Sequence, residues 1–215
     1  GQAGLFASLK KTDACARFEM FSGPPEILSV YHKPVPACNF AQTATQAALS
    51  VSLEHAVDPK QITAIRIRVP HSAAVYPGCD FSGPFENILQ AKMSIQFNVA
   101  AALLNRGVTE NNFSALNDVE LVRLLRVTTL EVDPQMTQAY PQKQGGEVFV
   151  TVNAETVCHA RLENVVNATH EEVQARFKQA AVARLGQARA DRLEAFILRI
   201  ESSEDVGLIG ALMQV

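Results

Sequence analysis

The sequence has no large excess of charge of either sign. Its 215 residues include 19 lysines and arginines against 22 aspartates and glutamates. A balanced charge gives no strong attraction to polyanions or to anionic lipid surfaces. We therefore expect neither a nucleic-acid partner nor a membrane partner. With 47% apolar residues, the chain is long enough to bury the core of a globular protein.

Cysteine is scarce, and long apolar runs are missing. The cysteines have neither CxxC spacing nor the density of a disulfide scaffold; they are Cys15, Cys38, Cys79 and Cys158. This distribution is typical of free thiols in a reducing compartment. No segment has the pattern of a signal peptide or of a membrane-spanning helix. These absences predict a cytoplasmic protein.

The common catalytic and cofactor motifs are also missing. The sequence has no GxGxxG, P-loop, GxSxG or HExxH pattern, and its histidines occur singly, without the spacing of metal ligands. We therefore expect no cofactor and no metal. A lone histidine rarely acts in catalysis without an orienting partner. Solvated or hydrogen-bonded side chains are expected at His55, His71, His159 and His170.

The periodicity of apolar residues predicts an α+β fold. Strands are expected at residues 27–32, 61–70, 128–133, 146–153 and 155–163, the last two forming a hairpin around Asn153-Ala154. Helices are expected at residues 39–51, 86–105 and 117–127, and from Thr169 onward. The order gives a small mixed α/β domain of about four strands flanked by helices. It lacks the βαβ alternation of a doubly wound sheet.

Capping and flexible residues predict where these helices begin and end. Asn39 is expected to cap the first helix, and Asn117 or Asp118 the third. Gly107 is expected to end the long helix that starts at Glu86, whose largely apolar circumference places it in the core. Polar residues inside that helix need partners, and we expect core hydrogen bonds there rather than substrate contacts. These residues are Lys92, Ser94, Gln96 and Asn98.

Lys33 stands in a loop that two prolines stiffen, in the stretch "YHKPVPACNF". A residue before proline is driven into an extended conformation. The lysine ammonium and the free N–H groups of the following helix therefore converge where a carboxylate could bind. The same spacing also fits an exposed loop lysine without a function.

Cys38 directly precedes the expected helix. A helix N-terminus lowers the pKa of a thiol and favours the thiolate, which would suit a base or a nucleophile. A small buried apolar side chain is the alternative role for a cysteine at this position.

Three blocks in the same order resemble the MmgE/PrpD family, which includes 2-methylcitrate dehydratase and cis-aconitate decarboxylase. The first is "HKPVPACNFAQTATQAAL" and the second "YPGCDFSGPFENILQAKMSIQFNVAAALLNRGVTENNF". The third is "YPQKQGGEVFVTVN", followed by a polar helical tail. The shared order covers most of the chain.

The resemblance implies a helical domain built from both ends of a longer chain, with an α/β domain inserted between them. Residues 1–24 would then be the end of the helical domain, residues 25–168 the inserted domain, and residues 169–215 the C-terminal helices. Because the chain opens at Gly1 with what resembles a helix end, we expect the C-terminal portion of a family member. The helical half with much of the acid/base apparatus would be absent, so the isolated chain would be inactive. The family also implies a homodimer.

The resemblance places the family's active-site lysine at Lys33. Cys38 stands where the decarboxylase has a histidine, Gln42 where many dehydratases have one, and Phe97 replaces a tyrosine, which disfavours a decarboxylase. We predict Lys33 and Cys38 as catalytic residues, and Lys33, His32 and Gln42 as substrate-binding residues.

The implied activity is a hydro-lyase, or dehydratase, acting on a small di- or tricarboxylate such as 2-methylcitrate. Such an enzyme removes a proton next to a carboxylate, and a desolvated lysine suits that step because burial lowers its pKa. An epimerase of an iminodisuccinate-type substrate in the same family is an alternative. A non-catalytic folding or dimerisation fragment is another, and an unrelated α+β binding protein is the third.

Overall fold

The computed structural model describes residues 23–214 and divides the chain into two compact units, Gly1–Tyr31 and His32–Val215. The described part of the first unit contains a 3-10 turn, η1 (Glu26–Ser29), followed by an extended Val30. The strand expected at residues 27–32 is therefore wrong, because the N–H of Leu28 turns back to the carbonyl of Pro25. The part of the expected helical segment before Gly23 lies outside the described residues.

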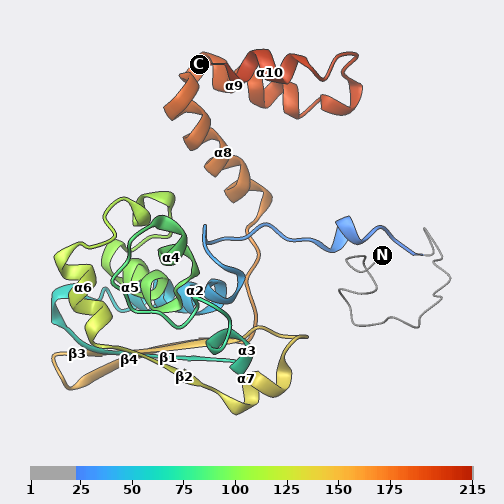
Figure 1. Cartoon of the computed structure of the whole chain (residues 1–215). Helices are drawn as coiled ribbons and strands as arrows, with labels where there is room; N and C mark the ends of the chain where they lie inside the picture. Colours follow the sequence, from blue (N-terminus) through green and yellow to red (C-terminus); the bar gives the residue numbers. More distant parts are fainter. Residues whose placement is uncertain (1–22, 215) are drawn as a thin grey trace. The chain divides into compact units, whose positions relative to one another are not determined.

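Four strands form one mixed sheet in the second unit (Figure 1). They are β1 (Ile62–Val69), β2 (Thr128–Val132), β3 (Gly146–Val152) and β4 (Thr156–Leu162), in the order β2-β1-β3-β4. β1 and β2 are parallel, whereas β3 is antiparallel to both β1 and β4. The predicted hairpin turns at Asn153 and Ala154, which both have positive φ. The α+β class and the four strands predicted from residue 61 onward are confirmed.

Helices cover one face of this sheet (Figure 1). The largest are α2 (Gln42–Glu54), α5 (Ile95–Asn105) and α6 (Val119–Arg126). Alternate residues of β1, namely Ile65, Ile67 and Val69, are buried beneath them. Shorter elements lie between these helices and strands along the chain: η2 (Asn39–Ala41), η3 (Pro59–Gln61), α3 (His71–Ala74), α4 (Ile88–Met93), η4 (Glu110–Phe113) and α7 (Pro134–Ala139).

The long helix expected from Glu86 to Asn105 is wrong, because it breaks at Ser94 into α4 and α5. Ser94 has an extended ψ of 123°, and its hydroxyl accepts a hydrogen bond from the N–H of Phe97, which caps α5. Gly107 does not end the helix either. Arg106 takes the left-handed conformation at φ 50°, and its guanidinium donates to the carbonyl of Val57 at 2.8 Å.

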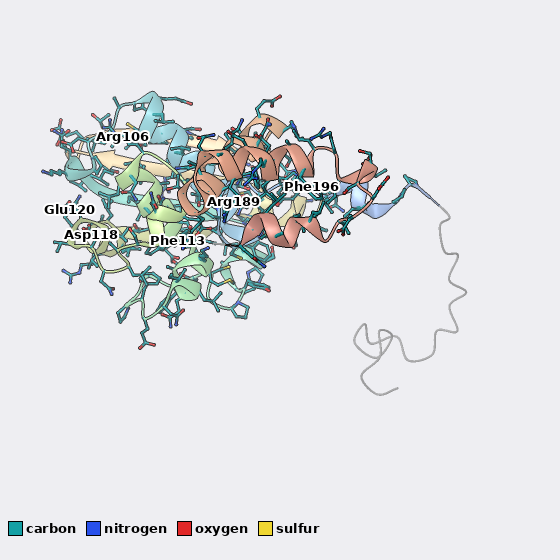
Figure 2. All side chains as sticks on the ribbon, turned by 90° about the horizontal axis from the view of Figure 1, so that it is seen from above. Arg106, Phe113, Asp118, Glu120, Arg189 and Phe196 are labelled. Atoms are coloured by element: carbon teal, nitrogen blue, oxygen red, sulfur yellow. The ribbon has the colours of Figure 1, made fainter. Side chains whose placement is uncertain are left out.

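Helix α6 begins as its sequence predicts. The carboxylate of Asp118 accepts hydrogen bonds from the N–H groups of Glu120 and Leu121, which confirms Asp118 as the cap. Figure 2 shows Asp118 and Glu120 close together at this end of the helix. In the core below, Phe113 stacks on Phe97 with ring centroids 5.6 Å apart.

The C-terminal segment is helical, as expected from Thr169 onward. It contains α8 (His170–Leu185), α9 (Gln187–Ile197), η5 (Ile200–Ser202) and α10 (Leu208–Met213). Thr169 and Glu172 form a capping box at the start of α8. Lys178 of α8 and Glu194 of α9 form an ion pair at 3.2 Å. The assignment of these helices to a separate helical domain stays a prediction.

Helix α2 approaches the sheet closely at Gly146. A Cβ atom built on Gly146 would lie 2.6 Å from the backbone nitrogen of Ala44, a distance that a real side chain does not tolerate. The hydroxyl of Thr43 donates to the carbonyl of Gln144 at 2.7 Å beside this contact. The glycine therefore lets the first turn of α2 rest on the start of β3.

A charged cluster lies on the sheet face away from α2, where alternate strand residues point. Arg68 contacts the carboxylates of Asp133 at 2.8 Å and Glu147 at 3.0 Å, which are only 2% and 5% exposed. Arg161 lies 3.8 Å from both carboxylates. Burial opposes ionisation of Asp133, but the N–H of Met136 and the guanidinium of Arg68 outweigh it and lower the pKa of this carboxyl. Arg66, on the same face of β1, is more exposed than Arg68.

Replacing Arg68 by methionine tests how much this cluster contributes to stability. Removing one partner of a buried ion pair leaves charges uncompensated, so Arg68→Met should lower the free energy of unfolding by about 3 kcal/mol. Arg66→Met on the same strand face is the matched control. Its ion pair with Glu131 is long and exposed, and we expect a loss below about 1 kcal/mol. Urea unfolding curves measure both values, and equal losses would contradict the assigned role of Arg68.

Candidate functional site

The loop from Lys33 to Cys38 is held by one buried side chain, that of Gln42. Its amide oxygen accepts from the N–H of Val35 at 3.0 Å. Its amide nitrogen donates to the carbonyls of Val35, Ala37 and Cys38 at 2.9, 3.1 and 3.1 Å. The amide of Gln42 thus links the backbone groups of three loop residues. In this structure Gln42 shapes the site, and the substrate contact predicted for it stays a prediction.

Asn39 does not cap α2 as expected. The chain enters through η2, and the N-cap positions fall at Cys38 for η2 and Ala41 for α2, neither of which forms a side-chain cap. The side-chain amide of Asn39 instead donates to the side-chain oxygen of Gln144 at 2.9 Å. Gln144 returns a hydrogen bond from its amide nitrogen to the carbonyl of Asn39. This reciprocal pair ties the entry of the helix to the chain just before β3.

Lys33 and its neighbour His32 are exposed. The Lys33 ammonium folds back over the loop and donates to the carbonyl of Ala37 at 3.2 Å. A cavity of about 300 Å³ does occur along α6, lined by Phe85, Asn117 and Arg126 among others, but Lys33 does not line it. Lys33 therefore presents its charge at the surface of the loop.

Cys38 lies half-buried under this loop, and its thiol meets a second thiol. The sulfur atoms of Cys38 and Cys79 are 3.7 Å apart. Cys79 comes from the turn after α3 and is fully buried. Both are free cysteines, as is Cys158 in β4, which confirms the expectation for these three. Cys15 lies outside the described residues.

The surroundings of Cys38 favour its thiolate. The hydrogen bond from Cys79 is the largest effect; burial opposes it, while the N–H groups of Phe40 and Asn39 and the charge of Lys33 support it. Together they lower the pKa of Cys38 to about 6. The pKa of Cys79 is raised, because its proton is held in the same hydrogen bond and the thiol is buried. At neutral pH the site therefore holds a thiolate beside an ammonium.

The structure brings Lys33 and Cys38 together. The N–H groups at the start of the helix, which were expected to help bind a carboxylate, instead contact Cys38. The N–H groups of Asn39 and Phe40 bond to the Cys38 sulfur rather than point to open solvent. Lys33, whose ammonium contacts the neutral carbonyl of Ala37, keeps a positive charge available to an outside anion. Sequence analysis missed Cys79, since no spacing rule links two cysteines that lie 41 residues apart.

The polar residues of α4 and α5 serve the core, as expected. The amide of Asn98 donates to the carbonyls of Ala91 at 3.0 Å and Ser94 at 2.7 Å. The amide oxygen of Gln96 accepts from the N–H of Phe81 at 3.2 Å. Lys92 differs, because its ammonium forms an ion pair with Glu110 at 2.8 Å. None of these contacts points to a substrate role.

The histidines outside the loop behave as predicted. All are exposed, and His159 is hydrogen-bonded to Glu147 at 2.8 Å; the others are His55, His71 and His170. Among residues 23–214, no three side chains of His, Cys, Asp or Glu are grouped as metal ligands would be. In the same part of the chain, no helix has both the length and the apolar character needed to cross a bilayer.

Gln42→Met tests whether this amide holds the loop. The substitution leaves the buried N–H of Val35 without its acceptor and removes one donor from each of three carbonyls, so we expect the free energy of unfolding to fall by about 2 kcal/mol. Gln46→Met, one helical turn later, is the control. The Gln46 amide bonds to the backbone of Val166 at an exposed position, where water can replace it. Gln46→Met should therefore lower the free energy of unfolding by less than about 1 kcal/mol. If urea unfolding shows the two losses to be the same, the loop does not depend on Gln42.

The reactivity of Cys38 should follow the ionisation of its thiol. Alkylation by iodoacetamide, measured by mass spectrometry of the peptide that contains Cys38, should rise with a midpoint near pH 6. In Cys79→Ala the midpoint should move up toward about 8.5, because the hydrogen bond that most favours the thiolate is gone. Cys158→Ala should leave the midpoint unchanged. If Cys79→Ala leaves the midpoint unchanged, the hydrogen bond from Cys79 is not what lowers the pKa of Cys38.

A search of curated proteins gave no match to the chain. A model of the MmgE/PrpD C-terminal domain matches residues 35–202, a range that includes Cys38, Gln42 and Cys79. Lys33 lies just before that range. The resemblance drawn from the sequence blocks is confirmed, and the chain belongs to the MmgE/PrpD family, with the match to its C-terminal domain.

Proposed function

We propose that this chain serves a hydro-lyase of the MmgE/PrpD family that dehydrates a small di- or tricarboxylate such as 2-methylcitrate. The observation that carries the proposal is the Cys38 thiol, whose pKa is about 6, beside the ammonium of Lys33. Thiolate and ammonium together can serve a reaction that needs a base near an anion-binding cation. A general base works best when its pKa lies near the working pH.

Lys33 supplies the cationic half of the mechanism. Its ammonium contacts a neutral carbonyl of the loop, so an incoming carboxylate can replace that contact with a charge-assisted hydrogen bond. The bound carboxylate accepts electron density when the neighbouring carbon loses its proton. The positive charge of Lys33 then stabilises the enolate-like intermediate more than the starting acid, which lowers the barrier.

Cys38 supplies the basic half. Its thiolate takes the proton from the carbon next to the bound carboxylate and becomes a thiol. The electron pair left on that carbon forms the double bond as the β-hydroxyl leaves, and the hydroxyl takes up a proton from solvent to depart as water. His32, exposed beside Lys33, is proposed to bind a second carboxylate of the substrate. Gln42 contributes by holding the loop that carries the other three residues.

Lys33→Ala tests the proposal in the whole product of the gene that encodes this chain. With 2-methylcitrate as substrate, we expect kcat/KM to fall about 10² to 10³-fold, because the group that stabilises the developing charge is removed. Lys60→Ala, which removes another exposed lysine, in η3, should leave kcat/KM unchanged. Alkene formation is followed by ultraviolet absorbance.

The same assay distinguishes the other candidate activities. Run in D2O, a hydro-lyase forms alkene, whereas an epimerase exchanges deuterium at the reacting carbon without forming alkene. Unchanged turnover in Lys33→Ala would remove Lys33 from the mechanism. Neither alkene nor exchange in the parent protein, across a panel of di- and tricarboxylates, would overturn the hydro-lyase and favour a non-catalytic role.

A further inference from the structure

Two thiols from distant parts of the chain face each other at the loop. The sulfur of Cys38 lies 3.7 Å from that of Cys79, although the residues are 41 positions apart. A disulfide needs the sulfurs to approach to about 2.05 Å. Forming the bond therefore requires the two side chains to rotate toward each other. One thiol of the pair is half-buried and the other fully buried, so a small oxidant meets Cys38 first.

The backbone holds both cysteines against the junction of α4 and α5. The N–H of Cys38 donates to the carbonyl of Lys92 at 2.8 Å, and the carbonyl of Cys79 accepts from the N–H of Ile95 at 2.9 Å. The two anchoring groups lie on either side of Ser94, the residue at which the helix breaks. Backbone hydrogen bonds to the junction of α4 and α5 therefore hold the two thiols next to each other.

We propose that Cys38 and Cys79 form an oxidation site, at which hydrogen peroxide converts the two thiols into a reversible disulfide. Cys38 is the attacking residue, because it is the more accessible thiol and carries the thiolate. Cys79 is the resolving residue, because it lies in contact with the sulfur that becomes oxidised. Redox-active cysteines are typically accessible, ionised and placed beside a resolving thiol.

The chemistry balances in two steps. The Cys38 thiolate attacks one oxygen of the peroxide; an S–O bond forms, the O–O bond breaks, and hydroxide leaves and is protonated to water. Cys79 then attacks the sulfur of the Cys38 sulfenic acid. An S–S bond forms, the S–O bond breaks, and the departing oxygen takes the Cys79 proton and leaves as a second water. The thiols lose two electrons, and the peroxide is reduced to two waters.

The disulfide would also switch off the proposed base, a consequence that rests on the proposed function. A Cys38 sulfur bonded to Cys79 has no thiolate to accept a proton from the substrate. A reductant that regenerates the two thiols would restore it.

The pairing can be read directly from the whole gene product. Trypsin places the four cysteines of this chain on separate peptides, with Cys38 on residues 18–60 and Cys79 on residues 69–92. After treatment with a few equivalents of hydrogen peroxide and blocking of remaining thiols with N-ethylmaleimide, mass spectrometry should find these two peptides joined, with two hydrogens lost. Dithiothreitol should separate them.

Variants of each cysteine test which thiol attacks the peroxide and which one resolves the sulfenic acid. Cys79→Ser should retain oxidation at Cys38 but carry it to the sulfinic acid, whereas Cys38→Ser should leave Cys79 reduced. Cys158→Ala should behave as the parent does. The proposal fails if peroxide takes Cys38 of the parent to sulfinic acid without joining the peptides, or if Cys38 pairs with another cysteine.

This readout is independent of catalysis. A joined pair in a protein without hydro-lyase activity would support the oxidation site and count against the proposed function alone. Activity that is lost with the joined peptides and regained with dithiothreitol would support both.

Discussion

The close approach of α2 to β3 is the constraint on which the site depends. Gly146 allows it, because any side chain there would strike the backbone of Ala44. Because the helix lies so close to the sheet, the hydroxyl of Thr43 donates to the carbonyl of Gln144. The side chain of Asn39 donates to the side chain of Gln144, which in turn donates to the backbone carbonyl of Asn39. These contacts fix the first turn of the helix to the sheet. The loop that carries the candidate catalytic residues leads directly into this fixed turn.

The break in the helix at Ser94 fixes the other side of the same loop. In a continuous helix, the carbonyl of Lys92 would accept from Gln96, and the N–H of Ile95 would donate to Ala91. Because the chain turns at Ser94, these groups are available to the two cysteine backbones instead. A feature that costs helical hydrogen bonds therefore supplies the anchors for the thiol pair. The interruption is part of the site rather than a defect of the helix.

Sequence periodicity predicted the elements whose structure is decided locally. The alternation in β1, the hairpin at Asn153-Ala154 and the cap at Asp118 all require only neighbouring residues, and all were confirmed. Three of the errors have a different cause, since they depend on residues far away in the sequence. Asn39 looked like a cap but is taken by Gln144, more than one hundred residues away, and the break at Ser94 depends on partners outside its helix. The role of Cys79 was missed for the same reason, since it depends on contact with Cys38, a residue distant in the sequence.

Two arrangements of charge in the described residues have different consequences. On the open sheet face, Arg68 and Arg161 are matched by the buried carboxylates of Asp133 and Glu147. Such a balanced cluster stabilises the fold and has little left to offer a ligand. At the loop, the Lys33 ammonium contacts a neutral carbonyl, and the nearby negative charge is a thiolate that appears only above about pH 6. A cation without a fixed carboxylate partner suits the binding of an outside carboxylate. That imbalance, more than a cavity, distinguishes the loop as the candidate site.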